Sequence, residues 1–171
     1  SAGILSAAAD VSGFTALHFA AQGGHEDAVK ALLEHSHYRG LLILAENSHD
    51  RRTALHLAAE SGWEGIVRTL LDFCPSKPQL LGKTDSLGQT ALHLAALSGH
   101  AETVCALLRA ATDRSALLRI RERVTGQTAL HFAAEAGHAP TVHALLEFAT
   151  DADKLINQAD RCGRNTALHL A

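Results

Sequence analysis

The chain has 171 residues, and 47% of them are hydrophobic, which is enough to bury a core. Fifteen Lys and Arg stand against 18 Asp and Glu, and the formal net charge of -3 argues against a basic protein that wraps nucleic acid. No apolar run reaches the roughly 20 residues of a membrane-spanning helix, so we expect no membrane insertion.

One tetrapeptide, Thr-Ala-Leu-His, recurs along the chain. Its copies start at Thr15, Thr53, Thr90, Thr128 and Thr166, at intervals of 38, 37, 38 and 38 residues. Four copies continue through Ala-Ala to a Gly and then to a Val followed by a Leu pair. A unit this small can bury its apolar faces only against its neighbours, so the copies must stack.

The first unit shows how each repeat is built in chain order. Thr15 is a good N-cap for a helix over 16–22, which is rich in Ala and Leu. Gly24 suits the left-handed conformation that ends a helix. The segment 26–33 opens with two acidic residues and then carries an apolar stripe, which predicts a second helix.

The repeat resembles the ankyrin repeat, whose usual signature is Asp-x-x-Gly-x-Thr-Pro-Leu-His-x-Ala-Ala-x-x-Gly-His. The matching segments are 12–33, 51–71, 88–108 and 126–146, with a partial match from Gly163. Every copy has Ala in place of the Pro. The resemblance implies an all-α solenoid of stacked helix-turn-helix repeats joined by β-hairpin-like loops.

The period of about 38 residues exceeds the usual period of about 33. The surplus carries a recurring apolar pair, at Ile4-Leu5, Leu42-Ile43, Leu80-Leu81, Leu117-Leu118 and Leu155-Ile156. Regular spacing indicates regular burial. We therefore expect a lengthened second helix or an extra short turn in every repeat.

The predicted organisation follows the period. Residues 1–9 end a truncated repeat, four repeats occupy 10–47, 48–84, 85–122 and 123–159, and residues 160–171 begin a fifth. The chain has no Met, as expected for an excerpt of a longer protein. Its apolar ends predict fraying or end-to-end association of this segment, and a monomer in the full-length context.

The 12 histidines suggest metal binding or catalysis, but the repeat accounts for eight of them. Five belong to Thr-Ala-Leu-His, where the resemblance implies that the His hydrogen-bonds locally and joins the next repeat. Three follow a Gly in the turn between the two helices. The others, which are His35, His37, His49 and His143, lack metal-ligand spacing, and the sequence has no HExxH, GxSxG or Walker motif. We expect no metal, no cofactor, no catalytic residue and no enzymatic activity.

The three cysteines lie far apart in the sequence, at Cys74, Cys105 and Cys162. An odd number without a Cys-x-x-Cys pair predicts reduced thiols rather than a disulfide framework. This favours an intracellular protein, cytoplasmic or nuclear.

The resemblance implies that the hairpin tips and first helices form an elongated concave surface that binds a partner protein or peptide. The corresponding residues here are Phe14, Phe19, His49, Arg52, Trp63, Leu87, Gln89, Leu97, Arg121, Arg123, Gln127, Phe132 and Arg164. Phe14, Leu87 and Leu97 are apolar at variable positions and suggest the apolar centre of this surface, although isolated exposed apolar residues are common. Trp63 replaces the usual His of the turn and either contacts the partner or packs on a neighbouring repeat.

Basic residues accumulate in the C-terminal hairpins. Arg119, Arg121 and Arg123 face one acidic residue, Glu122, for a local charge of +2. We expect the partner to be acidic at this end, and a solvated charged edge is the alternative. A separate feature is Asn157, which resembles the hairpin Asn that is hydroxylated in some ankyrin proteins.

The sequence therefore predicts non-enzymatic recognition of a partner protein or peptide by a preformed groove. The alternative is a regulatory or substrate-targeting segment of a larger multidomain enzyme, channel or secreted bacterial effector. Direct binding of nucleic acid or lipid would require the hairpin arginines to dominate the surface.

Overall fold

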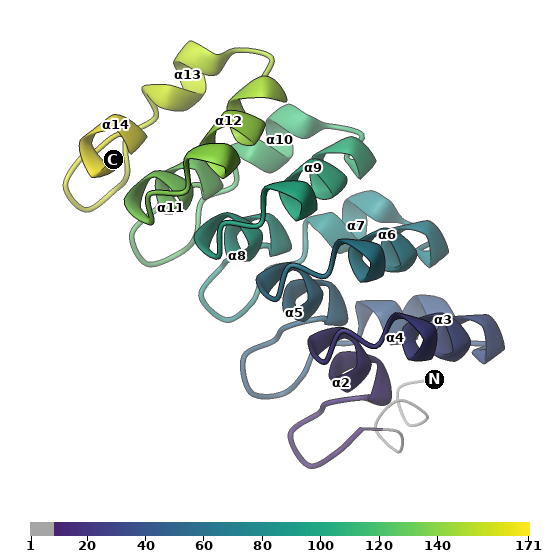
Figure 1. Cartoon of the computed structure of the whole chain (residues 1–171). Helices are drawn as coiled ribbons and strands as arrows, with labels where there is room; N and C mark the ends of the chain where they lie inside the picture. The colour runs from purple at the N-terminus through teal and green to yellow at the C-terminus, as the bar shows by residue number, and fades with distance from the viewer. Residues whose placement is uncertain (1–8) are drawn as a thin grey trace.

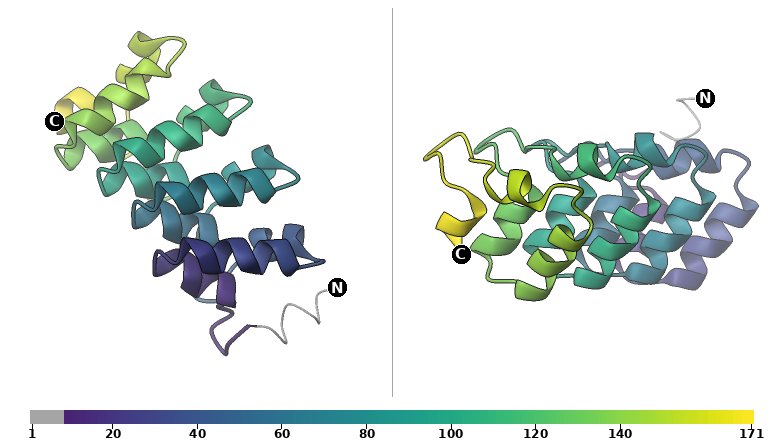
Figure 2. Two further views of the ribbon diagram at one scale, coloured as in Figure 1. Left: turned by 45° about the vertical axis from the view of Figure 1, so that its right-hand side comes forward. Right: turned by 90° about the horizontal axis from the view of Figure 1, so that it is seen from above.

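The computed structural model describes residues 9–171 and confirms the all-α solenoid. Within this range it contains 13 helices, no strand, and one isolated β-bridge between Ala9 and Thr15. The helices stack side by side from the N-terminus to the C-terminus as an elongated array, and the connecting loops follow one edge of it (Figures 1 and 2).

Each repeat contributes up to three helices. The first helices are α2 (Ala16–Gln22), α5 (Ala54–Glu60), α8 (Ala91–Leu97), α11 (Ala129–Glu135) and the short α14 (Ala167–Leu170). The second helices are α3 (Glu26–His35), α6 (Glu64–Phe73), α9 (Ala101–Ala110) and α12 (Ala139–Glu147). The third helices, which correspond to the surplus residues, are α4 (Arg39–Leu44), α7 (Lys77–Leu81), α10 (Arg114–Leu118) and α13 (Ala152–Ile156).

The surplus residues of each repeat are expected to form either a lengthened second helix or an extra short turn, and the third helices show which of these occurs. The chain leaves α3, α6 and α9 through a residue in extended conformation, so the second helix is not lengthened and a separate short helix follows. The apolar pairs supply the buried face of these helices, as Ile43, Leu80 and Leu118 show. The pair Ile4-Leu5 lies outside the described residues.

Alanine lets the first helices approach one another closely. Ala58, Ala59, Ala95 and Ala96 are completely buried between neighbouring first helices. Val and Leu of the second helices close the core on the other side, so one core runs along the whole array. This arrangement agrees with the stacking expected from units that cannot fold alone.

Five loops connect the repeats, namely loop 1 (10–14), loop 2 (47–52), loop 3 (85–89), loop 4 (122–127) and loop 5 (160–165). In loop 3 the Asp85 N–H donates to the Gln89 carbonyl, and the Asp85 carboxylate accepts from the Leu87 and Gln89 N–H groups, each at 2.9 Å. The first residue of every other loop plays the same part, and these are Asp10, Asn47, Glu122 and Asp160. The predicted repeat boundaries after residues 47 and 122 therefore run through loops 2 and 4.

Neighbouring loops are also joined to each other. One backbone N–H near the start of each loop donates to a carbonyl of the preceding loop, at 2.7–2.9 Å. The donor and acceptor pairs are Ser48 and Ser12, Ser86 and Asp50, Arg123 and Leu87, and Arg161 and Thr125. The loops thus form a continuous, ordered edge.

The recurring Thr and His link each first helix to the next repeat. The Thr90 N–H and hydroxyl both donate to Nδ1 of His93, at 3.2 and 2.8 Å. Nδ1 is therefore the unprotonated nitrogen, and Nε2–H donates to the Ile120 carbonyl at 3.1 Å. Equivalent links join His18 to Arg52, His56 to Gln89 and His131 to Asn165. These contacts confirm the structural role expected of this His.

Burial keeps these imidazoles neutral. His56 and His93 are at most 1% exposed, and removal from water lowers their pKa to about 4. Burial also lowers the pKa of His18 and His131.

We predict that acid weakens the fold through these histidines. In the unfolded chain these histidines take up a proton near pH 6.5, whereas in the folded protein His56 and His93 do so only near pH 4. Their contribution to the free energy of unfolding is therefore complete above pH 6.5 and is lost as the pH falls toward 4. Each of the two should lower the free energy of unfolding by about 1.4 kcal/mol per pH unit in this window. Urea unfolding at several pH values measures the slope. His93→Gln should reduce it, and the exposed His143→Gln should not; an unchanged slope in His93→Gln would contradict this explanation.

Loops 2 and 5 depart from loops 1, 3 and 4 at the turn, because each has an arginine where the others have a glycine. Gly13, Gly88 and Gly126 have φ between 73 and 84° two residues before the recurring Thr. At this position loop 2 has Arg51 at φ 60° and loop 5 has Arg164 at φ 56°. A side chain in this left-handed region is strained, and Gly is not.

We therefore predict that Arg51→Gly stabilises the protein by about 1 kcal/mol relative to Arg51→Ala. Both variants lose the ion pair between Arg51 and Glu46, at 3.1 Å, so their difference isolates the backbone effect. The measurement is the free energy of unfolding in urea. Equal stability of the two variants would show that residue 51 is not strained.

Candidate protein-binding surface

The base of each loop and the exposed side of the following first helix form one surface. In the second repeat the Arg52 guanidinium donates to the Glu60 carboxylate at 2.7 Å, across from loop 2 to the end of α5. In the fourth repeat Gln127 donates to Glu135 at 3.0 Å in the same way. We call the surface made by loops 1–5 and helices α2, α5, α8 and α11 the loop–helix surface.

Apolar side chains are exposed on this surface at several points. Phe19 on α2 is 53% exposed, and its ring centroid lies 5.3 Å from that of the half-buried Phe14. Leu87 in loop 3 and Leu97 at the end of α8 are 47% and 43% exposed. Val124 at the tip of loop 4 is 66% exposed. Exposed apolar groups thus occur in three of the four complete repeats.

The position of Phe19 is not equally open in every repeat. Leu57 and Leu94 occupy it on α5 and α8 and are at most 3% exposed. Phe132 occupies it on α11, is half-buried, and meets the edge of His93 with ring centroids 5.8 Å apart. The surface that a partner can reach therefore changes from repeat to repeat.

Three of the predicted contact residues are buried or have their polar groups bound by other residues of the chain. Arg52 contacts the carboxylates of Asp50, Glu60 and Asp85. Gln127 is only 8% exposed. Arg121 donates to the Gly126 and Ala159 carbonyls, which ties loop 4 to the segment before loop 5.

The remaining predicted loop residues are more accessible. His49, Arg123 and Arg164 are exposed, and Gln89 is half-buried. Asn157 is exposed at the end of α13, where its amide donates to the Asp153 carbonyl at 2.8 Å. Its hydroxylation stays a prediction.

Trp63 lies apart from the loops, because it follows the C-terminal end of α5 whereas loop 2 precedes the N-terminal end. Its indole N–H donates to the Gln22 carbonyl at 3.1 Å, and its ring covers Gly24 of the preceding repeat. His100 and His138 bind the Glu60 and Leu97 carbonyls in the same manner. The structure therefore shows the packing role for Trp63, although 43% of its surface remains exposed.

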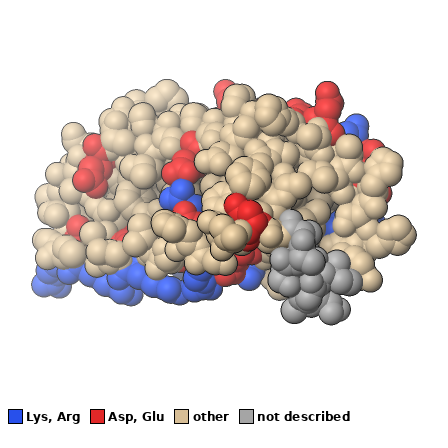
Figure 3. Space-filling view, turned by 90° about the horizontal axis from the view of Figure 1, so that it is seen from below, with Lys and Arg blue, Asp and Glu red and all other residues tan. Residues whose placement is uncertain are grey.

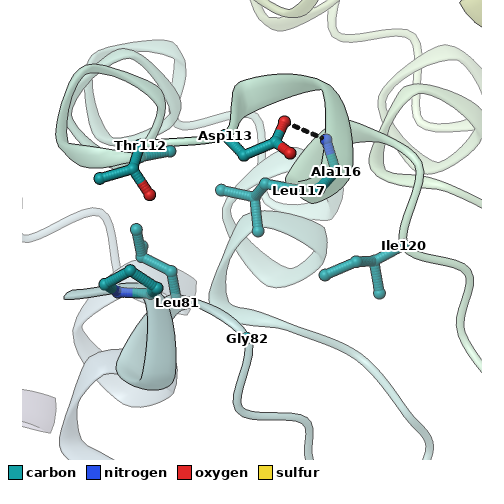
Figure 4. A pocket seen from close by; sticks show the side chains of 9 residues that line it. Leu81, Gly82, Thr112, Asp113, Ala116, Leu117 and Ile120 are labelled. Atoms are coloured by element: carbon teal, nitrogen blue, oxygen red, sulfur yellow. Dashed lines mark hydrogen bonds between the residues drawn. The ribbon is translucent and has the colours of Figure 1, made fainter. Parts of the chain in front are cut away.

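A cavity of about 210 Å³ lies between α7 and α10 (Figure 4). Its walls are mostly apolar and come from Pro78, Leu81, Gly82, Ala111, Thr112, Asp113, Ala116, Leu117 and Ile120. Asp113 is the only ionisable residue there, and its carboxylate accepts from the Ala116 N–H at 2.8 Å. The equivalent space between α10 and α13 is about 10 Å³, with Arg119 in place of Gly82. The cavity has no arrangement of acid, base and nucleophile.

Residues 9–171 contain no group of three His, Cys, Asp or Glu side chains placed to hold a metal ion. The same residues include no helix that is both long and apolar enough to cross a membrane. All three cysteines are free thiols.

Comparison with protein families agrees with the repeat architecture. A model for ankyrin repeats in three copies matches residues 39–117. A model for a single ankyrin repeat matches residues 12–39 and 125–161. A search of curated proteins finds no significant match. The matched segments include most of the chain and coincide with the stacked helices, so the chain belongs to the ankyrin repeat family.

Proposed function

We propose that this protein binds a partner protein or peptide, without catalysis, on its loop–helix surface. Ankyrin repeats are generally protein-interaction modules. The observation that carries the proposal here is the exposure of Leu87 and Leu97, which belong to the same repeat near the middle of the array. Exposed apolar side chains on an ordered surface are the usual centre of a protein interface.

The order of the surface also favours binding. Loops 2–5 are each held by their first residue, by the preceding loop and by a buried His that binds a carbonyl in the loop or just before it, so little loop entropy is lost on association. Phe19 and Val124 extend the apolar contact toward the two ends. We leave Gln127 and Arg121 out of the contact surface because their polar groups are bound within the chain.

A second candidate is a regulatory or substrate-targeting segment within a larger enzyme, channel or secreted bacterial effector. It uses the same surface, so the two differ in what is attached to the repeats rather than in the contact residues. An intracellular location, cytoplasmic or nuclear, is part of the proposal and is supported by the three free thiols.

We predict that Leu87→Arg combined with Leu97→Arg abolishes capture of the partner. Placing two charges in a buried apolar contact should weaken binding at least tenfold, since about 1.4 kcal/mol corresponds to a factor of ten. The measurement is affinity capture from a cell lysate with quantitative mass spectrometry, followed by titration of the purified partner.

The matched control is Tyr38→Arg combined with Leu41→Arg. Both residues are exposed to a similar extent, at 49% and 42%, but they lie beside and on α4, outside the loop–helix surface. Thermal unfolding of all variants checks that the fold is intact. Recovery of the same proteins with both double variants would place the binding surface elsewhere.

A further inference from the structure

Unpaired arginines gather on the C-terminal part of the loop edge. Lys and Arg form a band along this edge, and few acidic residues interrupt it (Figure 3). Arg123, Arg161 and Arg164 in loops 4 and 5 are exposed, and none of them takes part in the ion pairs found among residues 9–171.

The acidic residues of the same loops are turned inward. Glu122 is 2% exposed and accepts from the N–H groups of Val124 and Gln127 and from the Thr125 hydroxyl. Although burial opposes ionisation, these hydrogen bonds lower the pKa of the Glu122 carboxyl. Asp160 is 7% exposed and accepts from two N–H groups of loop 5. The carboxylates therefore hold the loops, and the guanidinium groups face the solvent.

Neighbouring loops hold the arginines in a regular order. The stem of Arg123 lies over Gly88 of loop 3, and the stem of Arg161 lies over Gly126 of loop 4. Both residues also donate their backbone N–H to the preceding loop, to Leu87 and Thr125. Because packed helices lie about 8–10 Å apart, the two stems are separated by about one repeat, which an extended chain crosses in about three residues.

We infer that the loop edge from Arg123 to Arg164 binds an extended acidic segment of the partner, with carboxylates at about every third residue. Opposite charges on an ordered edge give orientation and fast association. Val124 directly follows Arg123, is exposed, and offers an apolar contact beside it. The inference rests on the proposed function and specifies the chemistry of one end of the partner.

The distribution of basic residues favours a protein as the partner over a nucleic acid. On the face drawn in Figure 3 the basic residues form a narrow band along one edge, and the chain as a whole has a net charge of -3. Nucleic-acid binding proteins present a broad basic face that meets several phosphates. Within the exposed residues of loops 4 and 5 there is no aromatic side chain on which a base could stack.

The direct test uses synthetic peptides and the purified chain. One labelled peptide contains four Glu-Gly-Ser units, a second has Gln in place of every Glu, and a third has the same composition as the first with its Glu residues contiguous. Fluorescence anisotropy at low salt measures their dissociation constants. We expect the spaced Glu peptide to bind about tenfold more tightly than the other two, and its affinity to fall as salt is added.

Variants locate the contact. Arg123→Glu combined with Arg161→Glu should abolish binding of the spaced peptide, and the Gln substitutions, which keep part of the stem over each Gly, should weaken it. Lys30→Glu combined with Arg109→Glu makes the same charge change at exposed positions on α3 and α9 and should have no effect. Thermal unfolding confirms that each variant is folded.

Three results would overturn the inference: equal binding of the Gln peptide or of the contiguous Glu peptide, unchanged binding by Arg123→Glu with Arg161→Glu, or tighter binding of a single-stranded oligothymidine than of the spaced peptide. The proposed function is tested separately. If a partner captured from the lysate is lost with Leu87→Arg and Leu97→Arg but kept with the two Arg→Glu changes, the acidic segment is wrong and the loop–helix surface stands.

Discussion

The buried histidines are the contacts on which the order of the array depends. Each is fixed by the Thr that caps its own helix, and each binds a carbonyl in the loop that leads to the next first helix or just before it, as His56 does with Gln89 and His93 with Ile120. A neutral imidazole is suited to this because one nitrogen accepts while the other donates. The cap of one helix and the position of the next loop are therefore set together, and the loop edge is ordered within the chain itself.

The third helices form an additional layer of the solenoid next to the loop edge. They add a layer of short helices that buries the recurring apolar pairs and leads directly into the loops. The fit between neighbours in this layer depends on small local differences. Between α10 and α13 the Ser115 and Thr150 hydroxyls share a hydrogen bond at 2.8 Å, whereas the equivalent position on α7 is Pro78, which cannot form one. The open space beside Pro78 is thus a consequence of sequence differences within a regular layer.

Periodicity made most of the fold predictable, because each helix boundary and each buried His recurs at one position of the repeat. It was less informative about the binding surface. The engagement of Arg52 and Gln127 depends on Glu60 and Glu135, which are eight residues away on another element. Leu57 and Leu94 are buried although Phe19 at the same repeat position is exposed, and the repeat pattern alone does not distinguish them. The packing role of Trp63 follows from the sequence alone only if the His at the same position of the other repeats is known to bind the preceding repeat.

In loops 4 and 5, charges of opposite sign have different surroundings, since the acids are buried in the loops and the arginines are exposed. A carboxylate that accepts several backbone N–H groups is stabilised as an anion inside the loop, as the lowered pKa of the Glu122 carboxyl shows. Its charge is thereby directed inward to the loop amides. Arginines at the next positions have no such internal partner and extend over the glycines of the preceding loop. In loops 4 and 5 an acid therefore holds the loop backbone while the arginines are exposed to the solvent, and stacking the two loops repeats the arrangement along this part of the edge.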